Sequence, residues 1–133
     1  MIYKILFLDD NAERTKVFMD EINSLASLHD ILINVDYCAT ADKCIELLSN
    51  KKYDIVFLDH DLGGEVYVDA NRADTGSEVA RYISKNQERF INTKFILHSL
   101  NAVGRQNMFS LIRNNVYSIP FGWQNIDKIL NFS

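Results

Sequence analysis

Short apolar runs recur along the chain and predict five strands. Ile2–Leu8 and Tyr53–Leu58 are almost continuously apolar, which is typical of strands that are covered on both faces of a sheet. Ile31–Tyr37 alternates apolar and polar residues in its middle, as expected of a strand nearer an edge. Two further runs, Lys94–His98 and Val116–Ile119, predict the fourth and fifth strands.

Helical spacing fills the intervals between these strands. The pattern predicts helices within Asn11–Leu28, after the N-cap Thr40, after Thr75-Gly76, within Asn101–Asn115 and over Ile126–Leu130. On the buried side of the first helix the spacing places Val17, Ile22, Leu25 and Ala26.

Five strands that alternate with five helices predict the α/β class. Crossovers of this length join parallel strands, so we expect a three-layer sandwich around a five-stranded parallel sheet. The expected strand order is 2-1-3-4-5, as in flavodoxin-like folds. A chain of 133 residues supports one core, and we expect a single domain over residues 1–133.

The charge is distributed unevenly. Residues 1–75 carry 7 basic and 15 acidic side chains, whereas residues 76–133 carry 7 basic and 3 acidic ones. This distribution argues against bulk binding of nucleic acid. No apolar run approaches the ~20 residues that span a bilayer, and the first residues lack the pattern of a signal peptide. We therefore expect a cytoplasmic protein with no membrane partner, in which Cys38 and Cys44 are small buried residues.

Acidic side chains gather where two of the predicted strands end. Asp9 and Asp10 follow the first strand, and Asp59, His60 and Asp61 follow the third. These strands are neighbours in the order 2-1-3-4-5, so Asp9, Asp10 and Asp59 should converge. Three ionised carboxylates need a counter-charge, and Mg²⁺ or Mn²⁺ is the simplest one. The alternative is that these acids only cap helices or end strands.

The same positions resemble a response-regulator receiver domain over essentially the whole chain. The resemblance is carried by Asp9-Asp10, Asp59, Ser99 and Pro120. It implies that the acid pair holds Mg²⁺, that Asp59 accepts a phosphoryl group and that Ser99 contacts this group. Receivers also have a lysine just before the proline, and Ile119 stands there in this chain. An isoleucine cannot donate to a phosphoryl oxygen or offset its charge.

Four motifs narrow the resemblance to one group of atypical receivers, the cyclic-phosphate-processing receiver domains. They are Leu8-Asp9-Asp10 with Arg14, Leu58-Asp59-His60-Asp61-Leu62-Gly63, Thr75-Gly76, and His98-Ser99-x-Asn101-x-x-Gly104-x-x-Asn107-Met108. They occur in the correct order across residues 6–108. The chain departs from the pattern at Ala102, where a proline is expected.

His60 and His98 are the candidate proton-transfer residues. Imidazole titrates near neutral pH, so one ring could activate a water while the other protonates the leaving oxygen of a phosphoester. Direct metal ligation is a second option, and hydrogen-bonded histidines at strand ends are a third. Asp61 is a candidate for the metal site through a metal-bound water, or an orienting partner of His60; a solvated loop carboxylate is the alternative.

Five groups are candidates for binding phosphate. Ser99 and Asn101 carry suitable donors, although Asn101 also fits the N-cap of the fourth helix. Thr75-Gly76 opens a helix whose N–H groups could meet an anion, or serves as a simple cap. Arg105 and Arg14 are the candidate guanidinium clamps, and Arg105 is the better one, although a solvated arginine is the alternative there. Arg14 lies one helical turn from Asp10 and could pair with an acid instead.

The sequence thus predicts a metal-dependent phosphoesterase or phosphoryl-transfer enzyme that acts on a cyclic or terminal phosphate of a nucleotide or RNA end. The polar stretch Gly63–Asp74 is longer than most loops of its kind and predicts a cover over the substrate, with a disordered insertion as the alternative. One rival is a receiver that is phosphorylated on Asp59 in phosphorelay signalling. Another is a non-catalytic pseudo-receiver that binds a protein partner.

Overall fold

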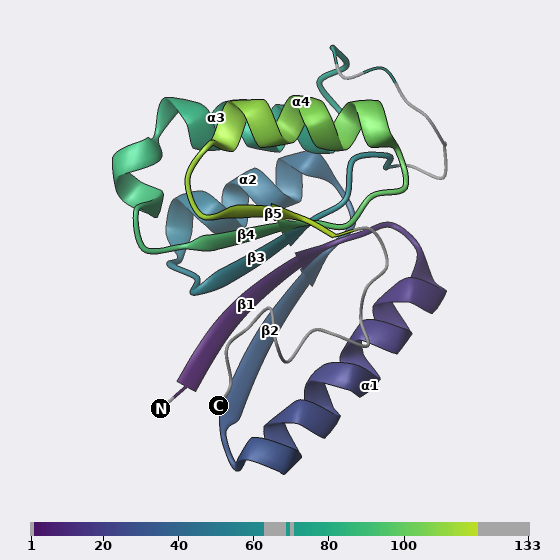
Figure 1. Ribbon diagram of the computed structural model, residues 1–133, viewed down its shortest axis with the longest axis vertical. Coiled ribbons are helices and arrows are strands. Elements are labelled where there is room, and N and C mark those ends of the chain that lie inside the picture. Colours follow the sequence, from purple (N-terminus) through teal and green to yellow (C-terminus); the bar gives the residue numbers. More distant parts are fainter. Residues whose placement is uncertain (1, 63–68, 70, 120–133) are drawn as a thin grey trace.

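A five-stranded parallel sheet forms the centre of the protein, as Figure 1 shows for the computed structural model. The structure describes residues 2–62, 69 and 71–119. Its strands are β1 (Ile2–Leu8), β2 (Leu32–Cys38), β3 (Ile55–Leu58), β4 (Lys94–Leu97) and β5 (Val116–Ser118). All neighbouring pairs are parallel and the order is β2-β1-β3-β4-β5, which confirms the predicted fold class and strand order.

Helices cover both faces of this sheet. They are α1 (Ala12–His29), α2 (Ala41–Asn50), α3 (Gly76–Lys85) and α4 (Ala102–Ile112), with a short 3₁₀ helix, η1 (Gln87–Phe90), after α3. In Figure 1, α1 lies on one face and α2, α3 and α4 lie on the other. The expected three layers are therefore present. The predicted helix over Ile126–Leu130 lies outside the described residues, as do Pro120 and most of Gly63–Asp74.

The alternation of side chains along each strand divides the core into two clusters. In β1, Leu6 and Leu8 pack with α2, α3 and α4, whereas Ile5 and Phe7 pack with α1. Strand β3 repeats this division, and all four of its residues are buried. Burial on both faces explains why these strands are continuously apolar in sequence.

The inward side of α1 differs from the prediction at one position. Val17 is 48% exposed, and the neighbouring Phe18 is fully buried between β1 and β3. Phe18 stacks on Phe7, with 4.0 Å between the ring centroids, and meets Phe57 edge-on. The aromatic ring buries more apolar area than valine, and it turns the helix so that Val17 faces solvent.

Two further expectations are met in the described part of the chain. Cys38 and Cys44 are buried free thiols, and the Thr40 side chain caps α2 by accepting from the Lys43 N–H. Among the described residues, no helix is both long and apolar enough to cross a membrane.

Candidate functional site

The site begins with the register of three parallel strands. Leu8 of β1 pairs with Leu58 of β3, and Leu58 pairs with Leu97 of β4. The residues that follow therefore end at the same level of the sheet, and the Asp59 N–H donates to the Leu8 carbonyl over 3.1 Å. Asp9, Asp59 and His98 form one row beyond the carboxyl ends, where α/β folds bind ligands.

Three carboxylates meet at this edge. Asp9, Asp10 and Asp59 each place a carboxylate oxygen within 4.8 Å of those of the others. The Arg14 guanidinium lies among them, with Nε 2.9 Å from Asp9 and Nη2 3.5 Å from Asp59 and 3.8 Å from Asp10. Arg14 therefore pairs with the acids, which was the second of its two predicted roles. Asp61 does not belong to this cluster of carboxylates.

The two buried acids of the cluster have opposite electrostatic surroundings. Burial alone would raise the pKa of Asp9, but hydrogen bonds from His98 and Arg14 outweigh it and hold the pKa at about 2. Burial and the nearby charge of Asp9 raise the pKa of Asp59 to about 7, because the more distant Arg14 offsets them only in part. Among the residues that the structure describes, Arg14 is the cation that all three carboxylates share.

His98 supports Asp9 from behind. Its ring is fully buried, stacks on Phe7 with 5.0 Å between the centroids, and places Nε2 3.0 Å from Asp9 Oδ2. Burial lowers the pKa of His98, although the bond with Asp9 acts in the opposite direction. The contact between Nε2 and Asp9 Oδ2 fixes the direction of that carboxylate.

His60 lies on the other face of the sheet, below the first turn of α4. Its ring is fully buried, and its Nδ1 is 2.9 Å from Asp61 Oδ1. A Cβ built on Gly104 would come within 2.4 Å of the ring, so only glycine leaves room for the imidazole there. Asn101 completes the network, since its Nδ2 donates to Asp61 Oδ1 over 3.0 Å.

The structure separates the two imidazoles that were expected to act as a general base and a general acid on one phosphate. Side chains of successive strand residues point to opposite faces, so His60 cannot share the face of Asp59, whereas His98 does. Both rings are 0% exposed and each is bonded to a carboxylate. The structure therefore does not bring the two rings to one face: His98 lies against Asp9, and His60 lies against Asp61.

The β4–α4 connection carries two of the predicted phosphate-binding residues. Asn101 is the N-cap of α4, because its Oδ1 accepts from the Gly104 N–H over 2.9 Å. Ser99 is buried next to His98, and its Oγ accepts from the Asn101 N–H over 3.0 Å. Asn101 is thus bound into the loop and the His60 network, while Ser99 lies one residue from the row of Asp9, Asp59 and His98.

The start of α3 is closed to an anion at the positions that were expected to bind one. Thr75, Gly76 and Ser77 are all buried, and the Gly76 N–H donates to the His60 carbonyl over 2.9 Å. The Thr75 hydroxyl donates to the Arg72 carbonyl rather than capping the helix. Thr75-Gly76 therefore ties α3 to the end of β3.

Arg105 bridges the ends of β4 and β5. Its Nε donates to Ser118 Oγ over 3.0 Å and its Nη1 donates to the Ser99 carbonyl. The guanidinium thus comes from α4 and reaches the end of β5, where receivers carry a lysine and this chain has Ile119. Ile119 itself continues the sheet, since its N–H donates to the Leu97 carbonyl.

A cavity of about 410 Å³ opens beside the acid cluster, between α1 and the end of β2. Asp9 and Asp10 form one side of it, and Tyr37 and Met19 line it farther out. Sequence reasoning missed Tyr37 and Met19. The signal was the strand order, because residues that end β2 must lie beside those that end β1.

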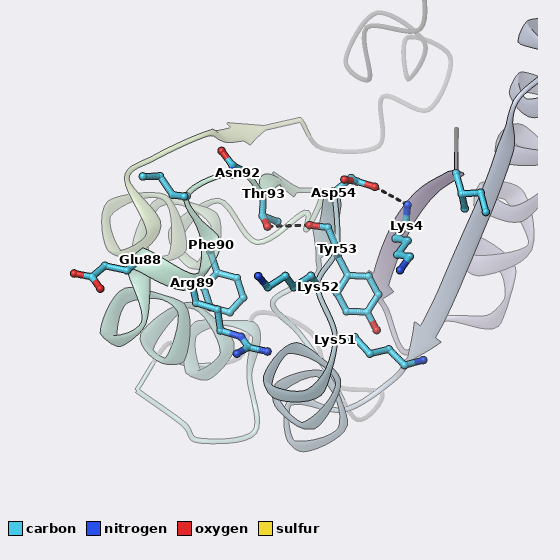
Figure 2. A pocket seen from close by; sticks show the side chains of 12 residues that line it. Lys4, Lys51, Lys52, Tyr53, Asp54, Glu88, Arg89, Phe90, Asn92 and Thr93 are labelled. Carbon is cyan, nitrogen blue, oxygen red and sulfur yellow. Dashed lines mark hydrogen bonds between the residues drawn. The ribbon is translucent and has the colours of Figure 1, made fainter.

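A second hollow lies at the opposite ends of the strands. This cavity of about 450 Å³ is lined by the residues that precede or begin β1, β3 and β4, among them Lys4, Asp54 and Thr93. Figure 2 shows the backbone N–H of Lys4 donating to Asp54 and the Thr93 hydroxyl donating to the Tyr53 carbonyl. This second cavity is separated from the acid cluster by the length of the sheet.

The described geometry agrees with one family of proteins. The model of the Cyclic-phosphate processing Receiver domain family matches residues 4–114, which include every side chain of the acid cluster and both imidazoles. The chain belongs to this family. A search of curated proteins found none that matches the chain.

Solved receiver domains share the fold at low sequence identity. The receiver domain of the sensor histidine kinase PA1611 from Pseudomonas aeruginosa, with magnesium coordinated in its active site cleft, is 20% identical with a TM-score of 0.70; the match covers 98% of this chain and 96% of that one. The response regulator TrrA from Thermotoga maritima, in complex with Mg²⁺ and BeF, is 19% identical with a TM-score of 0.69, and the match covers 98% and 99% of the two chains.

Proposed function

We propose that this member of the family binds Mg²⁺ at Asp9, Asp10 and Asp59 and acts there as a phosphoesterase on a cyclic or terminal phosphate of a nucleotide. The observation that carries the proposal is the convergence of three carboxylates whose oxygens lie within 4.8 Å of one another. Carboxylate oxygens are the ligands that Mg²⁺ prefers. The raised pKa of Asp59 supports the same conclusion, because it marks negative charge that a cation would offset.

The side chains around the cluster have distinct roles in this proposal. His98 holds Asp9 in a fixed direction through the 3.0 Å contact with Nε2. The Ser99 hydroxyl oxygen accepts from the Asn101 N–H, and in this proposal its proton is donated to a phosphoryl oxygen. When bound, Mg²⁺ would neutralise charge on the phosphoryl oxygens. His60, Asp61 and Asn101 hold the β3 and β4 ends in register without touching the substrate.

Phosphorylation of Asp59 in a phosphorelay is the second candidate function. It is favoured by the position of Asp59 directly after β3, inside the acid cluster. One solved neighbour, a response regulator from Burkholderia pseudomallei at 14% identity, carries a phosphorylated aspartic acid. The isoleucine in place of the lysine after β5 favours the phosphoesterase instead, because Ile119 itself cannot donate to an aspartyl phosphate.

Turnover of cyclic nucleotides tests the proposal directly. We expect Mg²⁺-dependent opening of a 2′,3′-cyclic nucleotide, followed by ³¹P NMR, with at least a hundredfold loss (about 3 kcal/mol) in Asp59→Asn and Asp10→Asn. The matched control is Asp20→Asn, an exposed acid on α1 that lies outside the cluster.

A parallel reaction with acetyl phosphate, read by intact mass, separates the two candidates. A lasting adduct that Asp59→Asn abolishes, without turnover of any cyclic or terminal phosphoester, would support phosphorelay signalling. If calorimetry detects no Mg²⁺ binding to the wild-type chain, both functions are excluded.

A further inference from the structure

We propose that the cavity between α1 and the end of β2 binds the nucleoside part of the substrate. This inference rests on the proposed function, because it concerns what is attached to the phosphate. The cavity is a shallow hollow of about 410 Å³ that is open to solvent. Apart from Asp9 and Asp10, the residues that line it have no role in the phosphoryl chemistry described above.

The position of the cavity fixes what can enter it. Asp9 and Asp10 belong both to the acid cluster and to the cavity wall. A phosphoester whose phosphate reaches the cluster therefore lies beside this hollow. The register of β1 and β2 causes this arrangement. The Cys38 carbonyl accepts from the Asp9 N–H, so the end of β2 lies beside the end of β1.

The lining suits a flat, partly polar ring. Tyr37 is half-buried, and its ring is braced edge-on by Phe7 and Phe18, at 6.1 and 6.4 Å between centroids. Met19 of α1 lines the same cavity and is 40% exposed. A braced aromatic ring and a polarisable thioether favour a nucleobase, which offers a π-face on either side.

Polar groups lie at the rim of the same cavity. Thr15 and Lys16 line it from the first turns of α1. Lys16 is exposed and carries a positive charge beside an otherwise acidic site, so it suits an anionic or hydroxyl-rich ligand rather than a hydrocarbon. An acyl phosphate or a small phosphorylated alcohol would leave the cavity empty, whereas a nucleoside phosphate would fill it.

Methionine methyl NMR tests the inference. Chain labelled with ¹³C in its methionine methyl groups is titrated with adenosine 3′-monophosphate, and separately with methyl phosphate, in the presence of Mg²⁺. We expect the Met19 signal to shift with the nucleotide and not with methyl phosphate, because only the base brings a ring current to it. Met108 is fully buried in the core and serves as an internal reference.

Affinities give an independent measure. We expect the nucleotide to bind at least about tenfold more tightly than methyl phosphate, and Met19→Ser to reduce this ratio at least about threefold. Val17→Ser is the matched control, since Val17 is similarly exposed on the same helix but does not line the cavity. It should leave the ratio unchanged.

The outcomes separate this inference from the proposed function. Equal affinity for both ligands, with an unmoved Met19 signal, would overturn the nucleoside site while leaving the phosphate site intact. If neither ligand binds in the presence of Mg²⁺, the proposed function itself fails, and the inference fails with it.

Discussion

Asp59→Asn is expected to stabilise the metal-free protein by about 2–4 kcal/mol at pH 8 and by almost nothing at pH 3. Asp59 is 3% exposed, and burial with the charge of Asp9 raises its pKa from 3.8 to about 7. Between pH 3.8 and about pH 7, the folded state binds more protons than the unfolded state. The stability of the wild type therefore falls as pH rises from about 4 to about 7, and it stays low above that range.

Urea unfolding in EDTA, at several pH values between 3 and 8, measures this effect as a difference between variant and wild type. The difference isolates Asp59 from His98, whose lowered pKa acts in the opposite direction because its charged form is lost on folding. Asp20→Asn, on the exposed side of α1, is the control. A difference of the same size at pH 3 and pH 8 would show that the raised pKa is not its cause.

Gly76→Ala is expected to destabilise the protein by roughly 3 kcal/mol or more. A Cβ at this position would lie 2.0 Å from the carbonyl oxygen of Asp59 and 2.9 Å from Cα of His60. Both contacts are with backbone, which cannot rotate away, so α3 must move from the end of β3. Urea unfolding gives the free energy, and Mg²⁺ affinity should fall as Asp59 is displaced.

Gly104→Ala provides the matched comparison. Its Cβ would meet the imidazole of His60, which is a side chain, so removal of that ring should relieve the clash. We expect Gly104→Ala to destabilise the wild type and to have a much smaller effect in a His60→Ala background. No comparable second change exists for Gly76. Its substitution by alanine without loss of stability would contradict the close approach of α3 to β3.

The positions of the central strands followed from the sequence because burial on both faces leaves a continuous apolar signature, as in the buried part of Ile2–Leu8. Their order followed from the expectation of a flavodoxin-like fold. The buried faces of the helices were predictable, except where the sizes of neighbouring side chains determine which one enters the core. Phe18 displaced Val17 from the core because an aromatic ring gains more from burial than a valine does. Spacing alone does not contain that comparison.

The site was predictable to the level of the strand ends and no further. The convergence of Asp9, Asp10 and Asp59 followed from the strand order alone. The separation of His60 and His98 was also available from the sequence, because adjacent strand residues alternate between faces. The sequence did not decide between the two roles of Arg14, which pairs with the acids, because local packing determines that contact. The same holds for Thr75-Gly76, which contacts the end of β3.

The imidazole of His60 fills the space that a side chain at residue 104 would otherwise take. The backbone of α4 thus rests directly on a ring that is anchored next to Asp59, with no flexible group between them to absorb a displacement. A rotation of that ring would therefore require the first turn of α4 to move away from the end of β3.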